Sequence, residues 1–106
     1  VLMGVGYALK EQVILENGKN MNPNFRDYKI LTAKDVVPIE APVLETYDDD
    51  GPFGAKEASE GSHVSAPPSV VSAIHHATGI WFKKQPVTAE NIALAMRDKR
   101  KKQAEG

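Results

Sequence analysis

The chain contains no cysteine. Disulfide bonds are therefore impossible, and the chain cannot hold a zinc ion or an iron–sulfur cluster through thiolates. It also lacks an excess of charge of either sign, because 13 lysines and arginines stand against 14 aspartates and glutamates. A net charge of −1 provides no electrostatic field for gripping nucleic-acid phosphates or an anionic membrane surface. We therefore expect no nucleic-acid partner.

Long apolar runs are absent as well. No stretch approaches the roughly 20 residues needed to span a bilayer, and the first residues lack the basic start and the cleavage site of a signal peptide. We therefore expect no membrane partner and a cytoplasmic location. What is present is ordinary, since 106 residues with 42% hydrophobic and 25% charged content are typical of one folded domain.

The N-terminal stretch, residues 1–10, is apolar from its first residue and has no N-cap residue before it. This pattern predicts the last turns of a buried helix. It also predicts that the chain is a fragment, a single partial domain over residues 1–106. Gly4 and Gly6 each cost the helix roughly 1 kcal/mol relative to alanine, so we expect close packing against another element at these two positions.

A β-hairpin is predicted directly after this helix. Residues 12–16 have the composition of a strand, and Asn17-Gly18 is a strong two-residue turn signal because both residues tolerate positive φ. A short return strand should cover residues 19–21. Residues 22–38 are rich in Asn, Asp and Pro and predict a long ordered loop.

Residues 39–46 alternate loosely between apolar and polar side chains. If they form a strand, Pro42 confines it to a sheet edge or a bulge. Asp48-Asp49-Asp50 then interrupts the pattern. These carboxylates could chelate calcium, but the run lacks the spaced oxygen ligands of an EF-hand, so a plain turn is favoured.

Two helices with a short strand between them are predicted for the second half. The first begins at residues 65–68, where prolines occupy the first turn, and ends at Gly79. Its predicted apolar face consists of Val70, Ile74 and Ala77.

Residues 80–85 read as the short strand, with Trp81 and Phe82 as its core and edge residues. Thr88 is the predicted N-cap of the last helix. The apolar residues assigned to that helix are Val87 and Ile92, as a hydrophobic staple, followed by Ala95 and Met96. Hairpin, long loop, helix, strand and helix in succession predict an α+β fold.

The segment from residue 51 to residue 61 is the most informative one for chemistry. It reads Gly51-Pro52-Phe53-Gly54-Ala55-Lys56-Glu57-Ala58-Ser59-Glu60-Gly61. Its glycines and small side chains would allow backbone N–H groups to approach a ligand closely, although such loops are usually simple turns. It is not a Walker loop, because the residue after Lys56 is not Ser or Thr.

This segment resembles the Gly-Pro-Phe-Gly-Ala-Lys-Gly-Val-Gly-Glu signature of the molybdenum hydroxylases, the xanthine dehydrogenase and aldehyde oxidase family. Other matches follow the family's order along nearly the whole chain. They are Gly4-Val5-Gly6-Tyr7-Ala8-Leu9, Asn22-Pro23-Asn24, Asp27-Tyr28-Lys29-Ile30, Thr32-Ala33-Lys34-Asp35 and Pro86-Val87-Thr88-Ala89-Glu90-Asn91-Ile92. The chain is therefore similar to the C-terminal part of the molybdopterin-binding domain of this family.

The resemblance implies a molybdenum ion carried by a pterin dithiolene, so the absence of cysteine is no objection. It implies that Glu60 is the catalytic base, which accepts a proton during hydroxylation of an electrophilic carbon. It also implies that Lys56, Glu57, Ala58 and Ser59 line the cofactor loop. Lys56 and Glu57 could instead pair with each other or with water, and Glu60 could be a solvated loop carboxylate.

The sequence departs from the family signature at Glu57-Ala58-Ser59, where many members have Gly-Val-Gly. This difference bears on close approach of the backbone to the pterin. The Lys-Glu-Ala variant most resembles the branch of the 4-hydroxybenzoyl-CoA reductases. The implied activity is that of an oxidoreductase acting on an aldehyde, an N-heterocycle or an aromatic thioester, or of the related reductase.

The implied partners are the remainder of the molybdopterin subunit and iron–sulfur and flavin domains or subunits, which would take the electrons. The alternative is a non-catalytic folding or interaction module that retains the family pattern without a bound cofactor. For the isolated chain we expect no cofactor and no activity. We also expect self-association through the face formed by Val1, Leu2, Val5 and Leu9.

His63, His75 and His76 raise the possibility of a metal site. Two adjacent helical histidines point in different directions, and none of the three has a histidine partner four residues away. Structural or surface roles are therefore favoured, and no protein-ligated metal is predicted.

Overall fold

The computed structural model describes residues 1–56 and 60–105. Its helices and strands are α1 (Leu2–Leu9), β1 (Leu15–Glu16), β2 (Lys19–Asn20), α2 (Phe25–Tyr28), α3 (Glu60–Val64), α4 (Ala66–Thr78) and α5 (Ala89–Ala104). Two 3₁₀ turns, η1 (Ala33–Asp35) and η2 (Pro52–Gly54), lie between α2 and α3. Over these residues the structure combines helices with a two-stranded sheet, which agrees with the α+β expectation at this coarse level.

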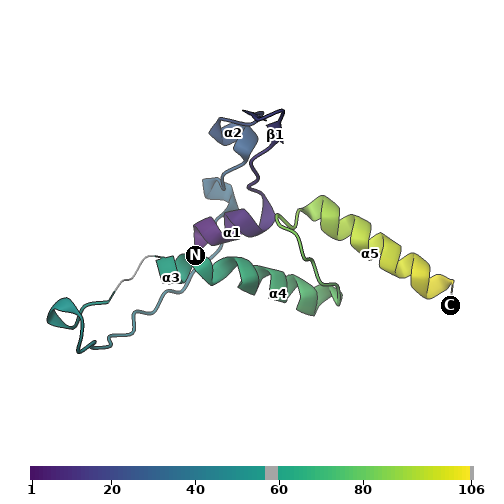
Figure 1. Ribbon diagram of the computed structural model, residues 1–106. Helices are drawn as coiled ribbons and strands as arrows, with labels where there is room; N and C mark the ends of the chain where they lie inside the picture. The colour runs from purple at the N-terminus through teal and green to yellow at the C-terminus, as the bar shows by residue number, and fades with distance from the viewer. Residues whose placement is uncertain (57–59, 106) are drawn as a thin grey trace.

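The packing of α1 against α3 and α4 forms the centre of the molecule (Figure 1). Gly4 is buried there, and a Cβ added to it would lie 2.6 Å from the Cβ of Ala66 and 2.9 Å from the carbonyl oxygen of His63. Ala8 is fully buried beside this contact. The close packing predicted for Gly4 is therefore confirmed.

The apolar face of α4 agrees in part with the predicted one. Val70 and Ile74 are half-buried, but Ala66 and Val71 are the buried residues and Ala77 is exposed. The reason is the position of α1, which meets α4 near its start, where Gly4 lies against Ala66. The predicted end of α4 is confirmed, because Gly79 adopts the left-handed conformation with φ 68° and donates its N–H to the carbonyl of His75.

The hairpin turn is confirmed, but its strands are shorter than predicted. Asn17 and Gly18 both have positive φ, 49° and 78°, and connect an antiparallel pair in which Leu15 faces Asn20. Upstream of Leu15 one more backbone bond follows, from the N–H of Met21 to the carbonyl of Ile14 at 2.8 Å, and the side chain of the buried Asn22 then takes over the pairing. Its Oδ1 accepts from the N–H of Ile14 at 2.9 Å, and its Nδ2 donates to the carbonyl of Gln12 at 2.6 Å.

Residues 22–38 contain two short helical turns where a loop was predicted. Asn24 caps α2 by accepting the N–H of Asp27 at 3.0 Å, and α2 ends at Lys29 in the left-handed conformation, φ 65°. In η1 the carboxylate of Asp35 accepts from both the backbone N–H and the hydroxyl of Thr32. Short side chains that bond to nearby backbone explain both turns.

The strand predicted for residues 80–85 does not form, since they belong to no ladder. The N–H of Ile80 donates to the hydroxyl of Thr78 instead of to a neighbouring strand. Trp81 is exposed and Phe82 is half-buried, so their assignment as core and edge residues of a strand was wrong. Trp81 stacks on the ring of His75 with 3.8 Å between centroids.

The start of α5 agrees with the sequence analysis. The hydroxyl of Thr88 accepts the backbone N–H of Asn91 at 3.2 Å, and the Oδ1 of Asn91 accepts the backbone N–H of Thr88 at 3.2 Å. Val87 is 1% exposed, and its N–H donates to the carbonyl of Ala8 at 2.6 Å. Beyond this anchor α5 meets the end of α4 through Lys99, whose Nζ donates to the carbonyl of Thr78 at 2.7 Å.

The molecule is extended. Its Cα radius of gyration is 18.4 Å, whereas a compact chain of this length has about 13 Å. Across residues 1–56 and 60–105, the buried hydrophobic residues are Ala8, Ala66, Val71 and Val87. Within the same ranges, no helix combines the length and the apolar character that crossing a membrane requires.

The isolated chain should therefore bind a hydrophobic dye and self-associate. Val1 is 51% exposed on the α1 face named above, and Phe25 and Val43 are more exposed still. Apolar surface of this extent favours association. Dye fluorescence and light scattering measure the two effects. A clean monomer that binds no dye would contradict the prediction.

Candidate functional site

The glycine-rich segment begins as a tight turn. The N–H of Gly51 donates to the carbonyl of Asp48 at 3.1 Å, and the N–H of Asp50 donates to the Asp48 carboxylate. The turn predicted at the three aspartates is therefore confirmed. Over the described ranges, no group of three His, Cys, Asp or Glu residues is placed to hold a metal ion.

The second half of this turn leaves no room for side chains at its glycines. A Cβ on Gly51 would collide with the carbonyl oxygen of Ala55, and Gly54, with φ 78°, lies against the ring of Tyr47. Phe53 also has a positive φ, 55°, and its side chain is fully exposed. A non-glycine residue in this conformation is strained, and such strain is concentrated at functional sites.

An open hollow of about 740 Å³ lies beside this turn. Its lining residues are Leu44, Glu45, Thr46, Tyr47, Phe53, Gly54, Ala55 and Lys56. The structure therefore places Lys56, one of the predicted cofactor-contacting residues, at a concave surface. Glu57, Ala58 and Ser59, the other three, lie outside the described residues.

Glu60 is the first residue of α3, where a loop had been predicted, and its side chain is exposed. The helix that carries it packs against α1, with the rings of Tyr7 and His63 in edge contact at 5.1 Å between centroids. The Glu60 carboxylate makes no hydrogen bond or ion pair with another described residue. It thus lies without a described partner at the start of a helix whose position is fixed by α1.

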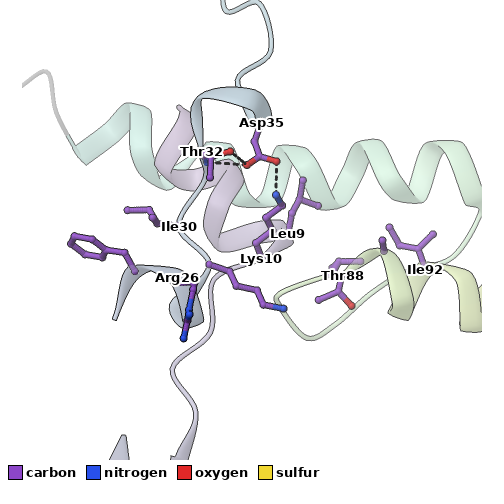
Figure 2. Close-up of a pocket in the computed structure, with 12 residues that line it drawn as sticks. Leu9, Lys10, Arg26, Ile30, Thr32, Asp35, Thr88 and Ile92 are labelled. Carbon is purple, nitrogen blue, oxygen red and sulfur yellow. Dashed lines mark hydrogen bonds and ion pairs between the residues drawn. The ribbon is translucent and has the colours of Figure 1, made fainter. Parts of the chain in front are cut away.

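A larger hollow of about 960 Å³ lies elsewhere, between α1, α2, η1 and the start of α5 (Figure 2). Leu9, Ile30 and Ile92 contribute apolar walls. On one side Lys10 forms an ion pair with Asp35, and the Lys10 ammonium together with the Thr32 donors holds the pKa of the Asp35 carboxyl far below its usual range. The Asp35 carboxylate therefore stays ionised below the pH at which ordinary carboxyl groups take up a proton.

This hollow contains none of the residues predicted for the site. Sequence reasoning missed it because its walls come from segments far apart in the chain. The spacing of Thr32 and Asp35 could have indicated their local bond, but no local signal relates either residue to Lys10. His63 lies against the ring of Tyr7 and His75 stacks on Trp81, whereas His76 is exposed at the surface.

Comparison with known proteins gives a consistent result. The family model of the molybdopterin cofactor-binding domain matches residues 1–37. A probable hypoxanthine oxidase of Escherichia coli is 34% identical over 97 residues, which cover 90% of this chain and 10% of that protein. The xanthine dehydrogenase molybdenum-binding subunit of the same species is 29% identical over 85% of this chain and 12% of its own length.

One of the subunits of nicotinate dehydrogenase from Pseudomonas putida is 30% identical over 91% of this chain and 8% of that protein. The chain thus spans about a tenth of the length of these relatives. The family model ends before the glycine-rich segment. The alignment with the hypoxanthine oxidase, in contrast, covers 90% of this chain, so it extends into the glycine-rich segment, residues 51–61.

Proposed function

Because the chain belongs to the molybdenum hydroxylases of the xanthine dehydrogenase type, we propose that it forms one wall of their cofactor site, with Glu60 as the catalytic base. The observation that carries the proposal is the position of Glu60. Its carboxylate has no partner among the described residues, lies on a helix held by α1, and follows the strained turn that places Lys56 at a hollow.

The residues present fit a cofactor that brings its own metal ligands. The chain has no cysteine, and its described residues form no metal-binding cluster. A molybdenum ion bound through the pterin dithiolene needs neither. Residues 56–59 would line the cofactor, with Lys56 as the charged member nearest to the hollow. When bound, the cofactor supplies the oxygen transfer and accepts the electrons of the reaction.

In this proposal Glu60 would accept, at its carboxylate oxygen, the proton of the attacking hydroxyl group as the carbon–oxygen bond of the product forms and the carbon–hydrogen bond of the substrate breaks. A general base must lie within hydrogen-bond reach of the proton that it accepts. The docking of α3 on α1 would position Glu60 for this role.

We assign the substrate to the N-heterocycles. The relatives named above are described by hypoxanthine, xanthine and nicotinate, all of which are N-heterocyclic compounds. Aldehydes and aromatic thioesters are the remaining possibilities within the family. Since this chain cannot ligate an iron–sulfur cluster through cysteine, the electrons would leave through iron–sulfur and flavin domains or subunits elsewhere.

The test is the distribution of molybdenum. The complete subunit, produced with molybdenum supplied, should contain the metal and should be reduced by hypoxanthine, xanthine or nicotinate. The isolated chain, produced in the same way, should contain essentially none, because one wall cannot bury a large cofactor. Elemental analysis measures both. Stoichiometric molybdenum in the isolated chain would contradict the one-wall proposal, and a metal-free complete subunit would favour the non-catalytic module.

A further inference from the structure

Residues 36–47 form an extended segment that makes no hydrogen bond with the described residues, although the ring of Tyr47 at its end lies against Gly54. It runs from η1 toward η2, away from the helices (Figure 1). None of its backbone N–H or C=O groups forms a hydrogen bond with any described residue. Its large apolar side chains are also exposed, with Val43 at 88% and Leu44 at 84%. Both the backbone polar groups and the apolar side chains of this segment are therefore exposed to water.

Burying these side chains against a protein surface would strip water from the backbone as well. Each unpaired backbone group then carries the cost of a lost hydrogen bond. Addition to the open edge of a β-sheet removes both problems, since the ladder pairs the backbone while the sheet face covers the side chains. An extended apolar segment is thus suited to strand addition.

The prolines determine which edge of this strand can pair. In a strand, the N–H and C=O of one residue point to the same side, and successive residues alternate between the two sides. Pro38 and Pro42 are an even number of residues apart, so their missing donors fall on one edge. The opposite edge is intact. It carries the odd-numbered residues, Val37, Ile39, Ala41, Val43, Glu45 and Tyr47.

The same parity separates the side chains. All odd-numbered residues from 37 to 47 are apolar or aromatic except Glu45, whereas the even-numbered face holds both prolines, Glu40 and Thr46 beside Leu44. Side chains at alternate positions lie on one face of a strand. The segment can therefore bury one face and pair through one edge.

Charge argues against a second copy as the partner. Between Asp35 and Lys56 the sequence contains Glu40, Glu45 and three aspartates and no basic residue. Two such segments side by side would repel, because like charges on adjacent strands are destabilising. The relatives extend far beyond the length of this chain, so a sheet within the same subunit is the natural partner.

We infer that residues 37–47 add as an edge strand to an open sheet edge in the remainder of the molybdopterin subunit, pairing through their odd-numbered residues. The receiving edge is apolar on the face that meets Val37, Ile39 and Val43, and it carries basic side chains near Glu45. The inference rests on the proposed membership of the chain in that subunit. It does not depend on the role of Glu60.

Residue-resolved hydrogen exchange tests it. In the complete subunit, the amides of Val37, Ile39, Ala41 and Val43 should exchange at least about ten-fold more slowly than those of Glu40 and Leu44. In the isolated chain all of them should exchange rapidly. Uniformly fast exchange in the complete subunit, or protection of the even-numbered amides alone, would overturn the inference. Protection in the isolated chain that rises with concentration would identify a second copy as the partner and overturn it equally.

Val43 and Leu44 provide a matched pair of variants. They are adjacent, apolar and almost equally exposed, but they lie on opposite edges. Val43→Pro removes a donor from the pairing edge and should abolish the protection of neighbouring odd-numbered amides. Leu44→Pro removes a donor from the opposite edge and should leave the protection of the odd-numbered amides unchanged. Equal loss in both variants would contradict the assigned edge. If Val43→Pro does not fold, the exchange pattern of the unaltered subunit decides.

Because exchange is measured without turnover, its outcome is separable from that of the proposed function. A protected strand in a subunit without molybdenum would support the strand and reject the cofactor site. Rapid exchange of these amides in an active subunit would reject the strand and support the cofactor site.

Discussion

In the complete molybdopterin subunit, Glu60→Gln should slow reduction of the enzyme by its substrate about a hundred-fold to ten-thousand-fold, the usual contribution of general acid–base catalysis. The amide keeps the shape of the side chain and removes its ability to accept the proton. The Glu60 side chain is exposed and makes no bond to another described residue, so fold and cofactor content should not change. The loss should therefore appear in the limiting rate of reduction more than in substrate binding.

Rapid mixing of enzyme and substrate measures this rate, after the molybdenum content of each variant has been confirmed. Glu90→Gln is the matched control, because Glu90 is also an exposed glutamate in the first turn of a helix. It should leave the rate unchanged. Reduction of the Glu60→Gln enzyme at the parental rate, with the metal present, would remove Glu60 from the role of base.

Gly4→Ala should lower the free energy of unfolding by about 1–3 kcal/mol, the usual cost of overpacking. The added Cβ would lie 2.6 Å from the Cβ of Ala66 and 2.9 Å from a backbone oxygen of α3. Neither neighbour can rotate away, so α1 must move off α3 and α4. Denaturant unfolding of the complete subunit, or of the isolated chain if it unfolds in one cooperative step, measures the change.

Gly6→Ala provides the control for Gly4→Ala. Gly6 is buried in the same helix, but an added Cβ there would meet the tip of the Glu11 side chain. That carboxylate can swing aside, and alanine favours the helix over glycine by about 1 kcal/mol. Gly6→Ala should therefore be neutral or stabilising. Equal destabilisation by the two substitutions would show that helix packing at Gly4 is not the cause.

The features that could be predicted from the sequence are those determined within a few residues. Asn17-Gly18 makes its turn because both residues tolerate positive φ, and Gly79 ends α4 for the same reason. Thr88 caps α5 with a partner three residues away. Such signals act without knowledge of the rest of the chain.

The failed predictions depended on distant partners. Residues 80–85 have strand-forming side chains, but no neighbouring strand accompanies them in the described structure. The buried face of α4 is determined by where α1 crosses it, which the periodicity of α4 alone cannot reveal. The ion pair of Lys10 and Asp35 likewise joins segments that share no local pattern.

The candidate site divides in the same way. Its glycine-rich turn followed from local sequence, whereas the role of Lys56 came from family resemblance and stays a prediction. The position of Glu60 at the start of a helix did not, because α3 is held by contacts with α1 and continues into α4. The role of Glu60 came from family resemblance, and it stays a prediction.

The hydrogen bond from Val87 to Ala8 joins an early and a late part of the chain, so the sequence between them forms a closed loop. The free energy of closing a flexible loop changes slowly with its length, by about 0.6 kcal/mol for each doubling. Insertions or deletions in the stretch between η1 and α3 should therefore leave the anchoring of α5 to α1 almost unaffected. The fold thus permits changes in the length of the segment that shapes the candidate site while the frame that carries it stays constant.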